Sequence, residues 1–406
     1  MKKLHFDVRD IFATPRLALS GKKIWVQFVG LAIGWAIYTI LTYLGLILNG
    51  QPLVEVWRTH HFFPCLWMVG LPVAWYAWLP SLLGMLIWVI LFLLASAAVA
   101  RITYKQLKGD EFFSSGDSFK YIKKHGIAVI MGPVSILLIM AFFIVMAFIA
   151  AWIAKWPVLD IIFLGLPYLL YFVVATFVVY TAVVFVVSLI LAPAIVGTSE
   201  EDTMETVFQS YSTLWGQPWR LVIYESLVGI LTLVATFVYG WALILGYKFF
   251  NLVFDASWLM DGKMTRIVDK AMSYIYGANS NITGFINQFF QTCSYRTLLP
   301  AEPTSCLTTT EYITAVLVGI ALLVIAGSVV SYLLTNFSVG QALIYIILRK
   351  KKDDENLIER KDEDELKEEE EKKKEEEAKT TETAEGETTA STESAPAEPS
   401  PENPAN

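Results

Sequence analysis

Charge, histidine and cysteine are scarce in this sequence, and their scarcity excludes several classes of protein. Only 17% of the 406 residues are charged, whereas soluble domains carry about 25%. Hydrophobic residues make up 55% of the chain, and several uncharged runs exceed the roughly 18–20 residues that a membrane-spanning helix needs. A soluble fold could not bury so much apolar surface. The sequence therefore predicts an all-α integral membrane protein with several spans.

The motifs of common enzymes and cofactor sites are absent as well. There is no Walker loop, no GxGxxG after a strand, no HExxH, no GxSxG and no EF-hand loop. His60, His61 and Cys65 lie close together in the sequence, but their spacing matches no specific metal site. No pattern indicates recognition of nucleic acid. We therefore expect no metal, no cofactor, no enzymatic activity and no nucleic-acid partner.

Six segments are long and apolar enough to cross a membrane. Prolines divide two over-long apolar runs, so we assign 62–76 and 158–166 to interfacial or re-entrant segments beside the spans. Basic and apolar residues alternate in 1–23, which indicates an interfacial segment rather than a simple basic flank. Within a membrane domain over 24–348, the spans are predicted at about 24–48, 77–100, 127–153, 168–196, 221–247 and 313–346.

The distribution of lysine and arginine indicates on which side of the membrane the termini lie. Residues 1–23 and 101–126 carry six basic residues each and 349–352 carries four, whereas the short loops on the other side carry one each. Because positive charge marks cytoplasmic loops, both termini are expected in the cytoplasm. The long segment 248–312 is then external, and its apolar residues predict two short amphipathic helices.

The net charge of −7 conceals two parts of opposite sign. From Asp353 onward there are 21 acidic and 7 basic residues, whereas the preceding chain has 24 basic and 17 acidic residues. We assign 349–406 to a cytoplasmic tail, in which 353–379 forms a solvated charged helix and the remainder is disordered. Such a tail is suited to docking membrane or cytoplasmic proteins.

The segment 198–220 has the clearest signature of a helix outside the membrane core. Ser199 and Asp202 form a capping-box pattern at its start, and Gly216 and Pro218 mark its end. We expect a short amphipathic helix on the cytoplasmic membrane surface. The apolar residues that recur at the spacing of one helical face are Met204, Val207, Phe208, Tyr211, Leu214 and Trp215.

Two parts of the chain are similar enough to predict an internal repeat. Gly-Leu-Pro precedes the second span and again the fourth, and each time a span, a short cytoplasmic helix and a further span follow. This favours a parallel repeat of two span pairs, and chance recurrence of a common tripeptide is the alternative. The hinges of such a repeat would be Gly70, Pro72, Gly165 and Pro167.

Two local patterns inside the spans predict contacts. Glu225 is the one carboxylate clearly inside a predicted span, and Arg220 is close enough to pair with it. We predict a structural ion pair, with a functional role as the alternative, because ionisable groups inside membranes are functional candidates. Gly30 and Gly34 form a small-xxx-small pair, which predicts the close approach of another helix.

Cys293 and Cys306 lie in the predicted external segment, where oxidation is favoured. A disulfide between them would close a short loop and stabilise it by about 3 kcal/mol in the chain-entropy description. The alternative is two unpaired thiols in a reducing or anaerobic host.

One region resembles a known group of proteins. Ala192-Pro193-Ala194 ends a span, an acidic short helix follows and ends in Ser-Tyr-Ser-Thr-Leu-Trp (210–215), and another span comes next. This arrangement resembles poorly characterised bacterial multi-pass proteins, including the membrane domain attached to some glycerophosphodiester phosphodiesterases. The resemblance covers spans 2–5 and implies a bacterial cytoplasmic membrane but no specific activity, because no phosphodiesterase catalytic domain is present.

Three classes of function differ in what they require of the structure. We expect a non-enzymatic scaffold or assembly factor of a bacterial inner membrane, which contacts the bilayer through its spans and other proteins through its tail. The alternative is a transporter or flippase of a lipidic or apolar solute, which requires a continuous cavity lined near Pro72, Pro167 and Glu225. An unrecognised membrane enzyme would need clustered polar residues at one membrane depth, and the sequence indicates none.

Overall fold

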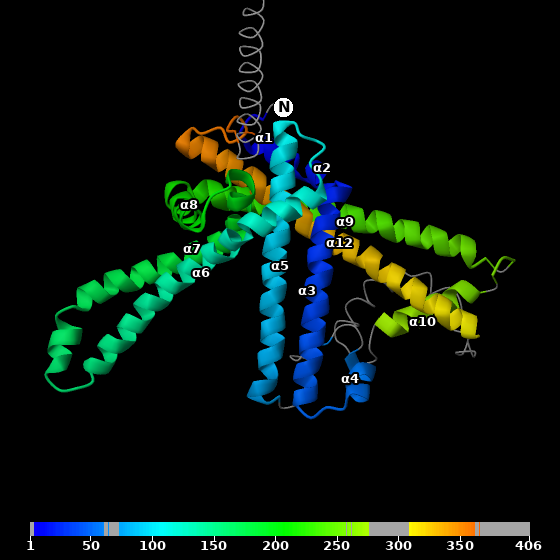
Figure 1. Ribbon diagram of the computed structural model, residues 1–406, viewed down its shortest axis with the longest axis horizontal. Coiled ribbons are helices and arrows are strands. Elements are labelled where there is room, and N and C mark those ends of the chain that lie inside the picture. The colour runs from blue at the N-terminus through cyan, green and yellow to red at the C-terminus, as the bar shows by residue number, and fades with distance from the viewer. Residues whose placement is uncertain are drawn as a thin grey trace, which may run out of the picture. The chain divides into compact units, whose positions relative to one another are not determined.

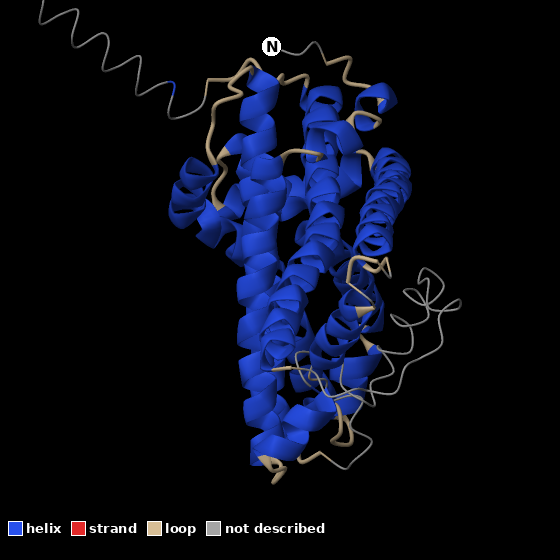
Figure 2. Cartoon of the chain, turned by 90° about the vertical axis from the view of Figure 1, so that its right-hand side faces the viewer, coloured by secondary structure: helices blue, strands red, loops and turns tan. Residues whose placement is uncertain are grey.

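The computed structural model describes residues 4–60, 64, 73–256, 258–260, 262–275, 308–361 and 365. Within these ranges the regular secondary structure is helical and contains no strand (Figure 2). Six of the helices described are long and apolar enough to cross a membrane, which confirms the predicted fold class. They are α3 (Gly21–Leu48), α5 (Trp75–Lys108), α6 (Ser115–Ile153), α7 (Tyr168–Ser199), α9 (Pro218–Phe254) and α12 (Thr309–Asp353).

Each long helix contains one predicted span and extends it, because a helix satisfies its own backbone hydrogen bonds inside and outside the membrane. The extension corrects the predicted loop over 101–126. α5 continues to Lys108, since Tyr104 and Leu107 on its last turns are still buried. α6 begins at Ser115, capped by Ser114, whose Oγ accepts from the backbone N–H of Asp117 at 3.1 Å. The short cytoplasmic helix expected before the third span is therefore the start of α6.

Shorter helices connect the long ones. They are α1 (Val8–Ile11), α2 (Thr14–Ala18), α4 (Leu53–His60), α8 (Thr203–Gly216), α10 (Lys263–Ile275) and a π-helical turn, η2 (Ile161–Gly165). α10 confirms the first of the two helices expected in the external segment, and its Ile267 and Ala271 pack on Ala315 of α12. The second lies outside the described residues.

The chain divides into two compact units, Met1–Leu357 and Ile358–Asn406. The first unit holds all the helices named above. The predicted tail therefore begins later than expected, since α12 runs to Asp353 and the first unit extends to Leu357. Beyond residue 361 the structure describes only residue 365, so the predicted helix and disorder of the tail lie outside the described residues.

α3 and α5 run side by side, as Figure 1 shows in blue and cyan. A Cβ added to Gly30 would lie 2.7 Å from the Cβ of Ala95, and one added to Gly34 would overlap the ring of Trp88. Both glycines therefore face α5, and only a residue without a side chain fits there. This confirms the predicted close approach and identifies α5 as the partner helix.

The C-terminal halves of α5, α7 and α12 pack against one another, and we call this region the helix junction. They are the second, fourth and sixth of the six described helices that are long and apolar enough to cross a membrane. Their buried residues concentrate in these halves, whereas the first half of α7 is largely exposed. Small residues from Ala95 to Ala100 and from Ala192 to Gly197 allow the helices to approach closely.

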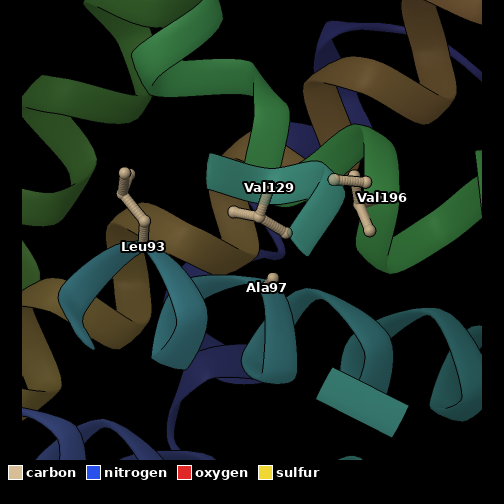
Figure 3. Close-up of a cluster of buried hydrophobic side chains, with 5 residues drawn as sticks. Leu93, Ala97, Val129 and Val196 are labelled. Carbon is tan, nitrogen blue, oxygen red and sulfur yellow. The ribbon is translucent and has the colours of Figure 1, made fainter. Parts of the chain in front are cut away.

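α6 also reaches the helix junction. Figure 3 shows Leu93 and Ala97 of α5 with Val129 of α6 and Val196 of α7, whose side chains gather where the three helices meet. Together with Ala128 they form one buried apolar cluster. The cluster holds the α6–α7 pair to α5 next to the charged residues described below.

Candidate functional site at the helix junction

A buried ion pair lies at the helix junction. The Arg101 side chain on α5 is fully buried, and its Nη2 lies 2.6 Å from Oε1 of Glu200 at the end of α7. The guanidinium also stands 4.4 Å from the ring centre of Tyr121 and 5.5 Å from that of Tyr104, within the range of cation–π attraction. Charge pairing and aromatic contacts together compensate the loss of water around a buried arginine.

The backbone at Glu200 positions this carboxylate. Glu200 ends α7 in the left-handed conformation, with φ at 59°, which is uncommon for a residue other than glycine. Its N–H donates to the carbonyl of Val196, which also accepts the hydroxyl of Tyr121 from α6. A left-handed residue with a side chain costs roughly 1–2 kcal/mol. The ion pair with Arg101 offsets that cost and turns the chain toward α8.

The end of α12 is fastened by charged and polar contacts. Arg349 pairs with Asp353 at 3.2 Å and with Glu355 at 2.9 Å. Lys350 pairs with Asp354 at 2.8 Å. The Tyr104 hydroxyl on α5 donates to the carbonyl of Leu357 at 2.8 Å, and Leu357 is fully buried. The chain that leads to the acidic tail is therefore tied to α5 as well as to its own helix.

The N-terminal segment meets the same end of the bundle. Lys351 of α12 donates to Asp7 at 2.7 Å, and Lys22 donates to the carbonyl of Glu111 in the α5–α6 loop at 3.2 Å. The N-terminal segment, this loop and the end of α12 therefore lie together at one end of the helix bundle.

The contact between Asp7 and Lys351 predicts an acid-sensitive attachment of the N-terminal segment. The hydrogen bond and charge of Lys351 hold the pKa of Asp7 below its usual value. Such a group contributes stability above its unfolded pKa of about 4 and loses it as the pH falls through the lower folded value. We expect the attachment to be intact at neutral pH and lost only in strong acid.

This expectation can be measured with a fluorophore attached at neutral pH to Phe12→Cys, an exposed position, in a chain whose native cysteines are replaced by serine. Iodide quenching should rise once the pH falls below about 4. Asp7→Asn is the control and should show high quenching at every pH. An identical acid transition in Asp7→Asn would mean that another group holds the segment.

Glu225 has a different partner from the one predicted. Its Oε2 accepts a hydrogen bond from Nε2 of Gln341 on α12 at 2.7 Å, and its Oε1 is buried with no hydrogen-bond partner. Arg220 is exposed, and no ion pair joins it to Glu225. Residues five apart point to different sides of a helix, so the interhelical contact replaces the predicted local pair.

A small cavity lies between α5, α7 and α12. Its polar lining includes Ser96, Ser338 and Gln341, and Phe92, Pro193 and Phe337 are among its apolar lining residues. The cavity measures about 10 Å³, which is room for a single water molecule. It contains neither Pro167 nor Glu225 in its lining, so it does not match the cavity expected of a transporter.

α8 confirms the predicted amphipathic helix, but only part of its apolar face packs on other helices and the rest is exposed. Val207 packs on Ile136 of α6 and Val184 of α7, and Tyr211 and Leu214 pack partly against the same cluster. The other members of the predicted face remain exposed and available to lipid; they are Met204, Phe208 and Trp215. α8 is thus anchored to two spans on one side.

The predicted start of α8 is corrected. Ser199 belongs to the last turn of α7, where its hydroxyl donates to the carbonyl of Ile195 at 2.7 Å. Asp202 occupies the N-cap position, without a side-chain cap hydrogen bond. The turn at Glu200 ends α7 later than expected and leaves only two residues between Glu200 and α8.

The repeat remains a prediction. Gly165 ends η2 and Pro167 is the N-cap residue of α7, whereas Gly70 and Pro72 lie outside the described residues. The two predicted units differ, because a separate helix joins α7 to α9 but only a loop joins α5 to α6. The predicted disulfide is also untested, since Cys293 and Cys306 lie outside the described residues.

Arg101, Glu200 and Gln341 are not among the interacting residues predicted from the sequence. The sequence places Arg101 in a loop and Glu200 at the start of the amphipathic helix, because each is the first charge after a long apolar run. A usable signal was present, since each run ends in small residues that favour close packing. For Gln341 the sequence offers no comparable signal. Over the described ranges no group of three or more His, Cys, Asp or Glu is placed to hold a metal ion.

The chain matches no protein-family model, no curated protein and no solved structure. The resemblance to the membrane domain of glycerophosphodiester phosphodiesterases therefore stays a prediction.

Proposed function

We propose that this protein is a non-enzymatic scaffold or assembly factor of a bacterial cytoplasmic membrane, with both termini in the cytoplasm. Its spans and the exposed side of α8 contact the bilayer. Its acidic tail binds other membrane or cytoplasmic proteins.

The observation that carries this proposal is the fastening of the chain where the tail begins. α12 is buried almost continuously from Ser331 to Leu348, and Arg349, Tyr104 and Lys350 hold the residues that follow it. A tail that holds other proteins at the membrane needs to start from a residue that is firmly packed in the membrane domain. The basic residues near the start of the chain and in the α5–α6 region support the cytoplasmic assignment of that side.

The scaffold can be tested by affinity purification from native membranes in mild detergent, with mass spectrometry of proteins and lipids. Full-length protein is compared with a truncation after Lys361, because a cut after Lys352 would remove the partners of Arg349 and Tyr104. We expect stoichiometric protein partners with the full-length chain and none with the truncation.

A second truncation, after Lys379, keeps the charged part of the tail and removes the segment rich in Thr, Ser and Pro. Partners retained by this variant bind the charged part. The scaffold proposal is contradicted if both truncations and the full-length protein carry the same partners, or if none carries any.

A transporter or flippase of a lipidic solute is the second candidate, and one observation favours it. Glu225 is a carboxyl inside a spanning helix without a cationic partner, and such groups commonly mark transport pathways. The water-sized cavity at the helix junction weighs against an open path for a solute. One lipid enriched equally in all three purified forms, without protein partners, would favour this candidate.

A further inference from the structure

Two side-chain oxygens in the contact between Glu225 and Gln341 have no hydrogen-bond partner, and one added proton could give a partner to both. The amide Nε2 of Gln341 donates to Oε2 of Glu225 at 2.7 Å. The other oxygen of each side chain, Oε1 in both, is buried and has no hydrogen-bond partner. Gln341 itself is only 2% exposed. Two buried acceptors therefore remain unsatisfied in one contact between α9 and α12, which is costly unless a donor is supplied.

Among the residues that the structure describes, no cation is paired with the Glu225 carboxyl. Arg220 on α9 is exposed, as are Arg9 and Arg16 on α1 and α2, which pack on α9. On α12, Lys351 pairs with Asp7, and Arg349 pairs with Asp353 and Glu355.

α8 and α10 also pack on α9, and neither supplies a described cation that pairs with Glu225. On α8, Glu205 accepts from Gln209. α10 packs on α12 at Ala315 and Gly319, and Gly319 lies roughly 33 Å along the helix from Gln341. Gln341 is thus the hydrogen-bond partner of Glu225, and it is uncharged.

A single proton satisfies both free oxygens. A carboxylic acid and a primary amide form a cyclic pair in which the amide N–H donates to one carboxyl oxygen and the carboxyl O–H donates to the amide oxygen. The first of these two bonds is already present. The second forms when a hydronium ion transfers its proton to Oε1 of Glu225, which makes an O–H bond there and leaves water.

We propose that Glu225 and Gln341 form a proton-binding site that joins α9 to α12 by two hydrogen bonds when protonated and by one when deprotonated. Glu225 lies seven residues after the start of α9, or roughly 10 Å along the helix. The proton therefore comes from the side of the membrane on which the N-terminal segment and the end of α12 meet. This inference is independent of the proposed scaffold function.

The site can be tested by infrared difference spectroscopy of the full-length protein in liposomes, between about pH 6.5 and about pH 9, where ordinary carboxyls are almost fully ionised. We expect the carbonyl band of a hydrogen-bonded carboxylic acid to disappear as the pH rises, and to be absent from Glu225→Gln. Gln341→Leu should shift the band, because the acid loses its amide partner. Glu311→Gln, which keeps a capping-box residue at the start of α12, should leave the band unchanged.

A second measurement needs no variant. A hydrophobic carbodiimide modifies protonated carboxyls in apolar surroundings, so the peptide that contains Glu225 should be labelled at low pH and progressively lose labelling as the pH rises. The proposal is overturned if Glu225→Gln keeps the band, if Gln341→Leu leaves it unshifted, or if labelling of Glu225 is absent or independent of pH.

Discussion

Replacing Arg101 with methionine is expected to lower the free energy of unfolding by roughly 3–5 kcal/mol, the cost of breaking a buried ion pair from one side. The Glu200 side chain is only 10% exposed, and without Arg101 its carboxylate would lose this ion pair while remaining in the helix junction. The left-handed turn at Glu200 would then lose the contact that offsets it. Unfolding in mixed detergent micelles, followed by circular dichroism, measures the change.

Two further variants separate this effect from the general cost of removing a charge. Lys120→Met breaks the exposed pair with Asp117, whose side chains are 83% and 49% exposed, and should change stability by less than about 1 kcal/mol. Arg101→Met combined with Glu200→Gln should be more stable than Arg101→Met alone, because no buried charge is left unpaired. Equal losses in Arg101→Met and Lys120→Met would contradict a structural role for the buried pair.

Gly197→Ala is expected to destabilise the helix junction by roughly 1–3 kcal/mol, the usual cost of overpacking. A Cβ at this position would lie 2.7 Å from the carbonyl oxygen of Ala97, 2.7 Å from the Cβ of Ala100 and 3.2 Å from the backbone nitrogen of Arg101. These are mainly backbone atoms, so α5 and α7 would have to move apart. That movement would also lengthen the contact between Arg101 and Glu200.

Gly229→Ala provides the matched control, since both glycines lie inside spanning helices. A Cβ at Gly229 would meet nothing within 4 Å. Alanine should therefore stabilise α9 by up to about 1 kcal/mol through its higher helix propensity. The two substitutions should have opposite signs in the same detergent unfolding assay. A shared sign would show that propensity or detergent binding, rather than the contact between α5 and α7, dominates the result.

The six spanning helices could be predicted because the physics of the membrane acts on local sequence. Backbone groups in lipid must pair within their own segment, so a sufficiently long uncharged run forms a helix whatever surrounds it. The predicted segment 168–196 and the observed α7, Tyr168–Ser199, begin at the same residue for this reason. The amphipathic face of α8 and the close approach at Gly30 and Gly34 also follow from local spacing.

The identity of the contacting partners could not be obtained in this way. Arg101 and Glu200 are 99 residues apart, and Glu225 and Gln341 are 116 residues apart. Local spacing instead favoured Arg220 as the partner of Glu225, because a sequence pattern can suggest only partners that lie close together along the chain. Which helices cross, and at what height, depends on the packing of whole surfaces against one another.

The helix ends near Lys108 and Asp353 also show what the sequence predicts and what packing decides. Charge marked 101–126 as a loop, yet α5 continues to Lys108 because neighbouring helices bury its last turns on nearly every side. Similarly, the residues after Lys352 belong by composition to the tail, but Arg349 and Tyr104 hold them in the folded unit. Composition indicates where the chain can leave the membrane. Packing against distant helices determines the last residue that belongs to the folded unit.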